Sequence, residues 1–495
     1  MKSTGKESLA PKTIIPDSTM KPFRLHFTTL LLAVVSSLPI QTCFAAKQGE
    51  VPNVLLLIID DLNTWQLERA GRYAGKVTTP NISAFADSGV SFKNAYTSSP
   101  KCSPSRTSFL SGVPPWKSGH TDNGLNLKNN TALESSTTFL KEFQDAGYFI
   151  AQIGKVSHGY DIGAKADIRF AHRRDPAPPK APFNGISKRN GEKVTETDWG
   201  PTHLDESEMN DTLKADTAVK ALQMKHDKPF VITCGLFLPH MAWWIPQKYL
   251  DMYPLDRITL PPVKADDLDD IPQAGKDLIK GTYAAAIEKK QYKKAVQAYL
   301  GTTTYADTQM GRVLDALEAS PYKDNTIVVL ISDHGFHVGE KHHWQKGSLW
   351  EDGTNTLFMV RAPGVTKPKQ VSETPVSLLD LYPTLMELTG LETPNHVDGR
   401  SLVPLLKDIN TPHDYPVISA YQNHVSVRTN VHRLIRYGDG EMELYDSRKD
   451  PNEWTNLINV PEKKEVVKRL SALLPEFEML PYARANRDKE KKKKK

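Results

Sequence analysis

The amino-acid sequence predicts an α/β fold, in which helices sandwich a large, mostly parallel sheet and a smaller antiparallel sheet follows near the C-terminus. Four continuous apolar runs, separated by stretches with helical spacing, are the first observation. Such runs are typical of strands that are buried on both faces of a parallel sheet. Short segments of alternating apolar and polar residues after residue 410 are the second observation, and they predict the smaller sheet. The 495 residues, 39% of them hydrophobic, are ample for one large core.

The N-terminus has the pattern of a secretory signal peptide. Lys21 and Arg24 precede the apolar run FTTLLLAVVSSLPI, which is short for a membrane span, and small residues follow it. We therefore expect residues 1–46 to form a signal region, with Met1 or Met20 as the start. The protein would then be periplasmic or secreted, without a stable membrane span.

Each of the four apolar runs leads into polar residues that can do chemistry. The runs are NVLLLII, YFIAQIG, PFVITCGLFLP and TIVVLIS, and the residues that follow them are Asp60 and Asp61, Lys155 and His158, His240, and Asp333 and His334. Open α/β sheets bind ligands beyond the carboxyl ends of their strands. The sequence therefore predicts that all these side chains gather at one edge of the sheet.

Helical stretches lie between the predicted strands. NISAFADSGVSF and TTFLKEFQDAGY both contain a glycine near the end, which is a common signal at a helix C-terminus. DTLKADTAVKALQMK and VQAYLGTTTYADTQMGRVLDALEAS have apolar spacing that is compatible with helical faces. Strands that alternate with helices predict a parallel sheet.

Residues 161–210 break this alternation. The segment is irregular and rich in proline and charge, as in AHRRDPAPPKAPFNG. We expect a long insertion near the polar edge of the sheet, which is either a substrate loop or a plain surface loop.

The pattern changes near residue 410. YPVISAYQ, HVSVRT, HRLIRYG and MELYDS are short alternating runs, and PEKKEVVKRLSALLPEFEML is typical of a closing helix. We expect a catalytic domain over residues 47–412 and an α+β subdomain over residues 413–486. Residues 487–495 then form a disordered, lysine-rich tail.

The positive charge of the chain is concentrated at its ends. The formal net charge is +5, and the last nine residues alone carry seven positive and two negative groups. The body between the ends is therefore not basic, and nucleic acid is not an expected partner. The tail itself could contact an anionic glycan or a cell surface.

The three aspartates at the predicted strand ends indicate a cation site. Clustered carboxylates repel one another unless a cation neutralises them, and oxygen ligands favour Ca²⁺ or Mg²⁺. Neighbours on a regular strand point to opposite faces, so Asp60 and Asp61 can share an ion only if the strand has ended. A pair of exposed turn aspartates is the alternative interpretation.

Positive and proton-donating side chains are expected around the same edge: Lys155, His158, His240 and Lys346. Together with a metal ion they describe a pocket for the ester of a tetrahedral oxyanion, either sulfate or phosphate. His342 and His343, in GEKHHWQKGSLW, are expected to be solvated surface residues.

Two cysteines remain after the signal region, which is too few for a disulfide framework. Cys234 lies in the apolar run PFVITCGLF and is expected to fill the core. Cys102 lies between Lys101 and a Ser-Pro-Ser-Arg sequence. This electropositive, turn-like setting suits a chemically used sulfur better than a buried one, although a surface turn with an incidental thiol is an equal alternative.

The segment CSPSR resembles the sulfatase signature Cys-x-Pro-Ser-Arg, and TSFLSG continues it. The similarity extends over nearly the whole mature chain and includes NVLLLIIDDL, TPNISAFADSGVSFKNAY, DGRSLVPLL and ELYDSRKDPNEWTNL. On these motifs the chain resembles the type I sulfatases of the alkaline phosphatase superfamily. IGKVSHG and SDHGFHVGE are most similar to the iduronate-2-sulfatase-like branch.

The resemblance implies that Cys102 is oxidised after translation to Cα-formylglycine by a formylglycine-generating enzyme. The aldehyde hydrates to a geminal diol, one oxygen of which attacks sulfur as the alcohol departs. The second hydroxyl then loses its proton and expels sulfate, which regenerates the aldehyde.

The resemblance also implies roles for single residues. One Ca²⁺ ion is held by Asp60, Asp61, Asp333, His334 and the modified Cys102. Arg106 orients the diol, Lys155 and His158 contact the diol or sulfate, His240 protonates or orients the leaving oxygen, and Lys346 binds sulfate. His334 stands where most of the wider family has asparagine. Leu238 replaces a lysine of the iduronate-type pattern, which weakens the case for iduronate as the substrate.

The sequence thus predicts a secreted, calcium-dependent sulfatase that acts on a sulfated carbohydrate. Two alternatives remain open: a phosphomonoesterase or phosphodiesterase of the same fold, and a non-catalytic protein that binds sulfated glycans. Phosphatases of this fold usually carry threonine or serine as nucleophile and two transition metals.

Overall fold

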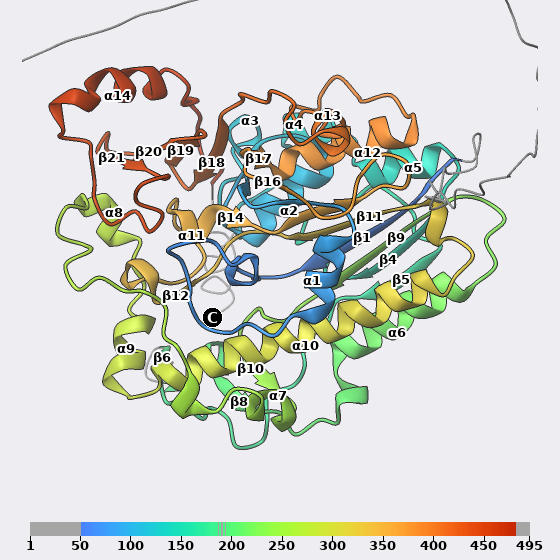
Figure 1. The fold of residues 1–495 in the computed structure, drawn as a ribbon, viewed down its shortest axis with the longest axis horizontal. Coiled ribbons are helices and arrows are strands. Elements are labelled where there is room, and N and C mark those ends of the chain that lie inside the picture. The colour runs from blue at the N-terminus through green and yellow to red at the C-terminus, as the bar shows by residue number, and fades with distance from the viewer. Residues whose placement is uncertain (1–50, 187, 190–191, 194, 482–495) are drawn as a thin grey trace, which may run out of the picture. The chain divides into compact units, whose positions relative to one another are not determined.

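An eight-stranded sheet is the central element of the computed structural model (Figure 1). The structure describes residues 51–481 except 187, 190–191 and 194, so the predicted signal region and lysine-rich tail lie outside the described residues. The sheet contains, in chain order, β1 Asn53–Ile59, β2 Val90–Phe92, β4 Phe149–Gly154, β5 Ile168–Ala171, β9 Phe230–Leu236, β11 Thr326–Ser332, β15 Phe358–Arg361 and β16 Gln370–Ser372.

The strand order is β16-β2-β15-β11-β1-β9-β4-β5. The four predicted strands, β11, β1, β9 and β4, are adjacent at its centre and pair in parallel. β15 pairs antiparallel with both β11 and β2, which makes the sheet mostly rather than wholly parallel. The predicted fold class is confirmed.

The prediction of an irregular segment over residues 161–210 is wrong where short strands form in it, and one of these strands joins the main sheet. Ile168–Ala171 forms β5, which extends the sheet in parallel beside β4. Its side chains alternate between partly buried and exposed, as expected for a short strand at a sheet edge. Such a strand carries no continuous apolar run, so the criterion that found the central strands did not find it.

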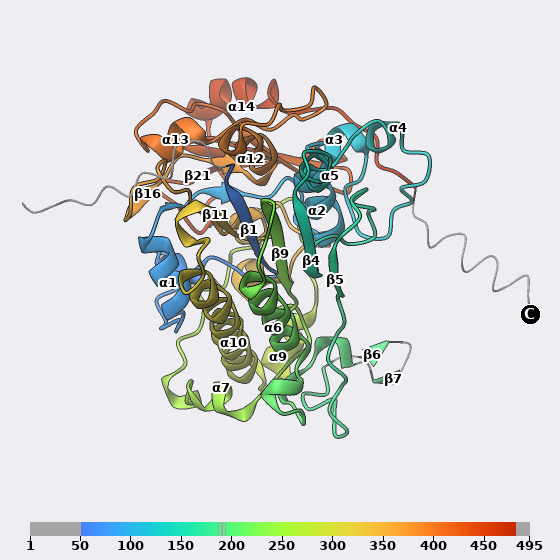
Figure 2. The same cartoon turned by 90° about the vertical axis from the view of Figure 1, so that its right-hand side faces the viewer.

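Both faces of the sheet are covered, which explains why its central strands are apolar throughout. Val54, Leu56 and Ile58 of β1 pack into one apolar core, and the residues between them pack into a second core on the opposite face. The helices that contribute to the first core are α2 (Cys102–Ser111), α5 (Phe139–Asp145), α12 (Leu381–Thr389) and α13 (Val403–Lys407). Those of the second are α1 (Pro80–Asp87), α6 (Asn210–Gln223) and α10 (Tyr292–Glu318), as Figure 2 shows.

Local sequence explains where several of these helices begin and end. Pro80 occupies the first turn of α1, where a missing N–H has no cost. Thr138 caps α5, because its hydroxyl accepts a hydrogen bond from the Lys141 N–H at 3.3 Å. Gly147 follows α5 with a φ of 87°, which is the left-handed conformation that ends a helix.

A four-stranded antiparallel sheet forms near the C-terminus, as the sequence predicts. It consists of β18 (Val417–Tyr421), β19 (His424–Arg428), β20 (His432–Arg436) and β21 (Met442–Asp446), in that order. Leu470 of α14 (Lys464–Ser471) packs on this sheet. Ser419 donates a hydrogen bond to the Thr97 carbonyl at 2.6 Å, so β18 braces the segment that leads into α2.

Shorter elements connect these layers. They are β3 (Ala95–Tyr96), β6 (Lys188–Arg189), β7 (Glu192–Lys193), β8 (Trp199–Pro201), β10 (Trp243–Ile245), β12 (His337–Val338), β13 (Trp344–Gln345), β14 (Asn355–Thr356), β17 (Val376–Ser377), α3 (Pro115–Ser118), α4 (Thr131–Glu134), α7 (Gln247–Asp251), α8 (Gln273–Asp277), α9 (Thr282–Glu288) and α11 (Glu351–Thr354). Among the described residues, no helix has the length and hydropathy that membrane crossing requires.

Candidate active site

The carboxylates of Asp60 and Asp61 lie directly beyond β1. The strand ends at Ile59, and Asp61 has a φ of 63°, so the chain has left the extended conformation. Both side chains can therefore face the same space. Asp60 and Asp61 are 0% and 1% exposed, so the alternative of exposed turn aspartates is wrong.

Cys102 is the first residue of helix α2 and is fully buried. Its sulfur lies 3.3 Å from His334 Nε2 and 2.9 Å from Lys346 Nζ. The predicted turn-like setting is corrected to a helix N-terminus, where the helix dipole favours negative charge. The alternative of an incidental thiol in a surface turn is excluded by its burial.

Four side chains from three parts of the chain offer ligand atoms to a common point. One atom each of Asp60, Asp61, Cys102 and His334 lies within 4.8 Å of all the others. His334 Nδ1 lies 2.9 Å from the Gly335 carbonyl, and donation to that oxygen leaves Nε2 with its lone pair toward the cluster. This donor set can hold a divalent cation.

Asp333 is adjacent to this group but is oriented differently. Its Oδ1 accepts a hydrogen bond from the Asp61 N–H at 3.2 Å, and its Oδ2 accepts one from Arg106 Nε at 2.9 Å. Burial, with the Asp60 charge adding to it, raises the pKa of Asp333 to about 7 despite the nearby guanidinium. Carboxylates held this close therefore favour a proton or a cation between them.

Arg106 connects the ends of three strands. Its guanidinium is fully buried, donates to Asp60 Oδ1 at 3.2 Å, and reaches the carbonyl of Val156 after β4 at 3.3 Å. With its bond to Asp333 after β11, it holds β1, β4 and β11 around the N-terminus of α2. We call Asp60, Asp61, Cys102, Arg106, Lys155, Asp333, His334 and Lys346 the strand-end cluster.

The strand-end cluster stabilises negative charge at the position of the Cys102 sulfur. Burial alone would raise the pKa of this thiol, but Lys155, Lys346 and His334 bring it well below its usual value. Lys346 Nζ also lies 2.6 Å from Asp61 Oδ1, and this carboxylate raises the pKa of the ammonium although burial opposes it. Lys155 pairs with the carboxylate of Asp60.

His240 and His158 lie at the outer side of the strand-end cluster. His240 Nε2 is 4.0 Å from Asp61 Oδ2, and its Nδ1 lies 2.7 Å from the Met241 carbonyl, which fixes the ring. His158 is exposed, and its carbonyl accepts a hydrogen bond from Ser103 Oγ at 2.7 Å. Of the residues predicted for the site, His158 is thus the one most open to solvent.

Sequence reasoning missed two residues that shape the site. The Tyr299 hydroxyl on α10 accepts from the Asn63 N–H at 2.8 Å and donates to the Asp61 carbonyl at 3.1 Å, so it fixes the turn after β1. The ring of Phe237 lies 4.5 Å from the ring of His240. Phe237 directly follows β9 and could have been found from that position, whereas nothing near Tyr299 in the sequence indicates its contact.

The degree of burial of His342, His343 and Cys234 was also predicted from the sequence. His343 is 0% exposed, which corrects the prediction of a solvated surface residue. His342 is only partly buried, and its Nε2 lies 2.8 Å from the Lys264 carbonyl. Cys234 is fully buried in β9, as expected for a core residue, and neither it nor Cys102 forms a disulfide.

The fold and the strand-end cluster together define a class of enzyme. A parallel sheet places acidic ligands, buried cations and a sulfur at a helix N-terminus around one point. This arrangement is that of a hydrolase that cleaves esters of tetrahedral oxyanions, since it can bind the anion and stabilise charge on a nucleophile.

Comparison with known proteins identifies the family. Residues 52–391 match the family described as Sulfatase, and residues 339–479 match the one described as N-sulphoglucosamine sulphohydrolase, C-terminal. The chain therefore belongs to the type I sulfatases of the alkaline phosphatase superfamily and is a sulfuric ester hydrolase.

Individual relatives agree with this assignment. A sulfatase of Formosa agariphila is 35% identical over 445 residues, which cover 87% of each chain. Iduronate 2-sulfatase of Mus musculus is 29% identical and covers 71% of each chain. The structure of a phosphonate monoester hydrolase from Silicibacter pomeroyi is similar with a TM-score of 0.71 at 23% identity, covering 85% of this chain and 94% of that one. At this identity the structural likeness concerns the fold alone.

Proposed function

We propose that this protein hydrolyses sulfate esters of a sulfated carbohydrate, with Cys102 converted to Cα-formylglycine as nucleophile and one Ca²⁺ ion bound beside it. The convergence of Asp60, Asp61, Cys102 and His334 within 4.8 Å is the observation that carries this proposal. The name of the iduronate 2-sulfatase relative supports a sugar as the alcohol part of the ester.

The donor set fits a divalent cation. Asp60, Asp61, His334 and the modified residue 102 would hold it, with Asp333 as a further ligand once its carboxylate turns from Arg106. When bound, the ion neutralises the carboxylates and favours ionisation of an adjacent hydroxyl. The carboxylates in this set favour a hard cation, so Mg²⁺ is the alternative to Ca²⁺.

The protein side chains then divide the chemistry between them. Lys155 and Lys346, which lower the pKa of a group at position 102, stabilise the ionised oxygen that attacks sulfur. The same two ammonium groups and His158 hold the sulfate oxygens, whose charge they balance. Arg106 keeps the N-terminus of α2 in place through Asp60 and the Val156 carbonyl, which follows β4.

His240 is positioned to protonate the leaving alcohol. Its Nδ1 is held by the Met241 carbonyl, so Nε2 is the nitrogen that faces the site. A formylglycine hydrate at position 102 would supply two hydroxyl groups at one carbon, one as the nucleophile toward sulfur and one whose ionisation would expel sulfate. Water would take the proton of the first hydroxyl, and His240, once it had protonated the alcohol, would take the proton of the second.

Secretion, maturation and domain boundaries are also proposed for this protein. A signal region over residues 1–46 would direct it to the periplasm or the exterior, and a formylglycine-generating enzyme would modify Cys102 on the way. We further propose a catalytic domain over residues 47–412 and a subdomain over residues 413–486.

Paired substrates and paired variants test the proposed function. Wild-type protein, Cys102→Ala and the matched control Cys234→Ala are assayed with 4-nitrophenyl sulfate and 4-nitrophenyl phosphate. We expect sulfate release by the wild type and by Cys234→Ala but not by Cys102→Ala. Faster turnover of the phosphate ester would instead favour the phosphatase alternative, and binding of sulfated glycans without turnover would favour the non-catalytic one.

A further inference from the structure

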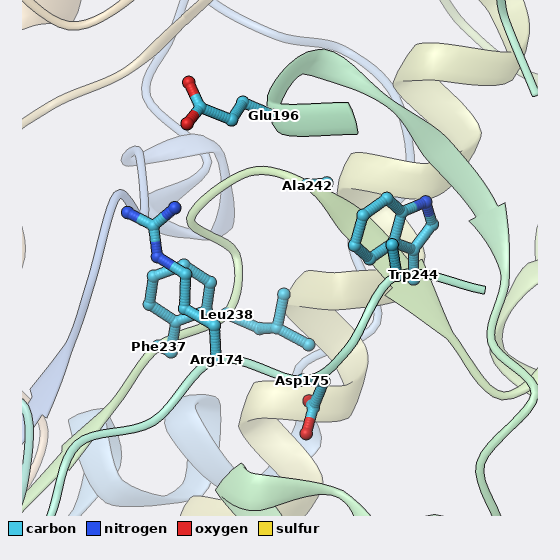
Figure 3. Close-up of a pocket in the computed structure, with 8 residues that line it drawn as sticks. Arg174, Asp175, Glu196, Phe237, Leu238, Ala242 and Trp244 are labelled. Carbon is cyan, nitrogen blue, oxygen red and sulfur yellow. The ribbon is translucent and has the colours of Figure 1, made fainter. Parts of the chain in front are cut away.

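A cavity of about 270 Å³ adjoins the strand-end cluster (Figure 3). Arg174 and Glu196 belong to the insertion before α6. They line the cavity together with Phe237 and Leu238 after β9 and Trp244 of β10. Figure 3 shows Arg174 beside the Phe237 ring on one side, the Trp244 ring on the other, and Leu238 between them. We call this cavity the Phe237 pocket.

Phe237 is a wall shared by the pocket and the strand-end cluster. Its ring lies 4.5 Å from the His240 ring, and Lys155 Nζ lies 5.7 Å from its centroid. The group that leaves from a sulfate ester at Cys102 is protonated by His240 in the proposed mechanism. The sugar attached to that oxygen therefore has the Phe237 pocket as a neighbouring space.

The walls of the pocket are held in place by hydrogen bonds. Asp211 accepts hydrogen bonds from the N–H groups of Phe237 and Leu238 at 2.9 and 2.8 Å. Trp244 Nε1 donates to Asp198 Oδ2 at 3.1 Å. A pre-formed pocket with two aromatic walls suits the apolar C–H face of a sugar ring.

The two outer charged groups of the pocket remain available to a ligand. The Arg174 guanidinium lies 5.3 Å from the Phe237 ring centroid and forms no ion pair with any residue that the structure describes. The neighbouring carboxylate of Asp175 is already engaged, because it accepts hydrogen bonds from Asn210 N and Nδ2 at 2.8 and 2.7 Å. Glu196 likewise has no ion pair with the described residues and can accept hydrogen bonds from sugar hydroxyls.

We propose that the Phe237 pocket binds a sugar ring that carries a second negative group, and that Arg174 holds this group. The inference rests on the proposed function, since it specifies the sugar that bears the sulfate ester. A guanidinium binds a carboxylate or a sulfate through two parallel hydrogen bonds, so a hexuronate or a disulfated hexose fits. The volume is near the lower end for small-ligand pockets, about 300 Å³, which suits one ring.

This proposal changes the interpretation of Leu238. From the sequence, the leucine weakened the case for a uronate substrate because it replaces a cationic residue. Leu238 and Arg174 line the same pocket, so a cation reaches that space from another segment of the chain.

The test compares Arg174→Ala with Arg173→Ala, a matched control in which the adjacent, exposed arginine does not line the pocket. Each is assayed with a sulfated hexuronate, a disulfated hexose, the corresponding monosulfated hexose and 4-nitrophenyl sulfate. For Arg174→Ala we expect kcat/KM to fall about 10- to 100-fold on the doubly charged sugars, mainly through KM. Arg174→Lys should recover part of this loss, and Arg173→Ala should resemble the wild type.

The substrates distinguish the possible outcomes. An unchanged kcat/KM of Arg174→Ala on 4-nitrophenyl sulfate and the monosulfated hexose, with a loss on either or both of the dianionic sugars, supports the proposal. A loss on one of the two shows whether Arg174 holds a carboxylate or a sulfate. An equal loss on all four esters, or no loss on any, overturns it. If the wild type cleaves no sulfate ester, the proposed function fails separately. Calorimetric binding of the sulfated hexuronate to Cys102→Ala, with and without Arg174→Ala, then still decides the role of the pocket.

Discussion

Two buried groups of charged residues in this protein differ in how their charges are matched. The first group is the strand-end cluster. The second group, which we call the arginine–glutamate network, lies between the main sheet and the C-terminal sheet and consists of Arg69, Glu351, Arg428, Arg433 and Glu453. Both groups are almost completely buried.

In the arginine–glutamate network, each strong contact joins opposite charges. Arg433 donates to Glu351 Oε2 at 2.6 Å and to Glu453 Oε1 at 2.7 Å, and Arg69 Nη2 lies 2.7 Å from Glu351 Oε1. Each of these carboxylates is thus paired with guanidinium groups of the network. The ion pairs give the network a structural explanation.

In the strand-end cluster, several donors face one point in addition to their ion pairs. Cys102, His334 and Asp61 converge there, although Asp61 already pairs with Lys346. Burial of charge therefore does not by itself identify an active site. The proposed active site differs from the network because ligand atoms from several segments converge on one point beyond the ends of parallel strands.

The largest effect that separates the two groups is expected from Cys102→Ala. Sulfatase activity should fall below about one per cent of wild type, because the substitution removes the proposed nucleophile. The unfolding midpoint should change little, since the cluster retains its ion pairs. Residual turnover above that level, measured as sulfate release, would contradict a covalent role.

Removal of the proposed cation should have the next largest effect. Dialysis against a chelator should reduce activity by about 100-fold, since the carboxylates then repel one another and lose a neutralising charge. Added Ca²⁺ should restore the activity, and the arginine–glutamate network should be unaffected. Recovery with Zn²⁺ alone would instead support the phosphatase alternative.

Arg433→Met should lower the free energy of unfolding by about 3–5 kcal/mol, because buried Glu453 loses its guanidinium partner and Glu351 loses one of its partners. The kcat of the folded fraction should remain near that of the wild type. Chemical denaturation with a parallel activity assay measures both quantities. Lys225→Met, which removes an exposed ion pair with Asp227, is the control and should be neutral. A loss of kcat without a loss of stability would place the network in the active site.

A smaller expected effect is that the stability contributed by Glu351 of the arginine–glutamate network decreases in acid. Burial alone would raise the pKa of Glu351, but Arg69, Arg433 and Arg428 keep it well below its ordinary value of 4.5. The unfolded state therefore binds more protons below pH 4.5, and the stability from this carboxylate is lost as the pH falls. Denaturation at several pH values should show that the difference between wild type and Glu351→Gln is largest above pH 4.5 and shrinks below it. A difference independent of pH would show that Glu351 is not ionised in the folded state.

The contrast also explains how much of the site could be predicted from the sequence. Asp60, Asp61, Asp333 and His334 directly follow long apolar runs, and parallel pairing brings such strand ends to one edge. Composition and order along the chain therefore predicted the sheet and the acidic ligands. Lys346 follows no apolar run directly, but it was expected at this edge because it comes after the Asp333 strand in the sequence. Its role in sulfate binding was implied by the resemblance to sulfatases.

Contacts between distant segments could not be predicted in this way. Arg69 and Glu351 lie far apart in sequence, and neither belongs to a local pattern that indicates their ion pair. Arg174 reaches the Phe237 pocket from an insertion whose composition fits a substrate loop and a plain surface loop equally well. The burial of His343 could not be predicted either, because the residues around it in the sequence are mostly polar.

Mass spectrometry of the peptide that contains Cys102 tests the central claim most directly. Protein secreted from a host with a formylglycine-generating enzyme should yield this peptide about 18 Da lighter than the thiol form, as expected when thiol becomes aldehyde. The fraction of modified peptide should rise in proportion to specific activity across preparations. A fully active preparation whose Cys102 is entirely unmodified thiol would contradict the account.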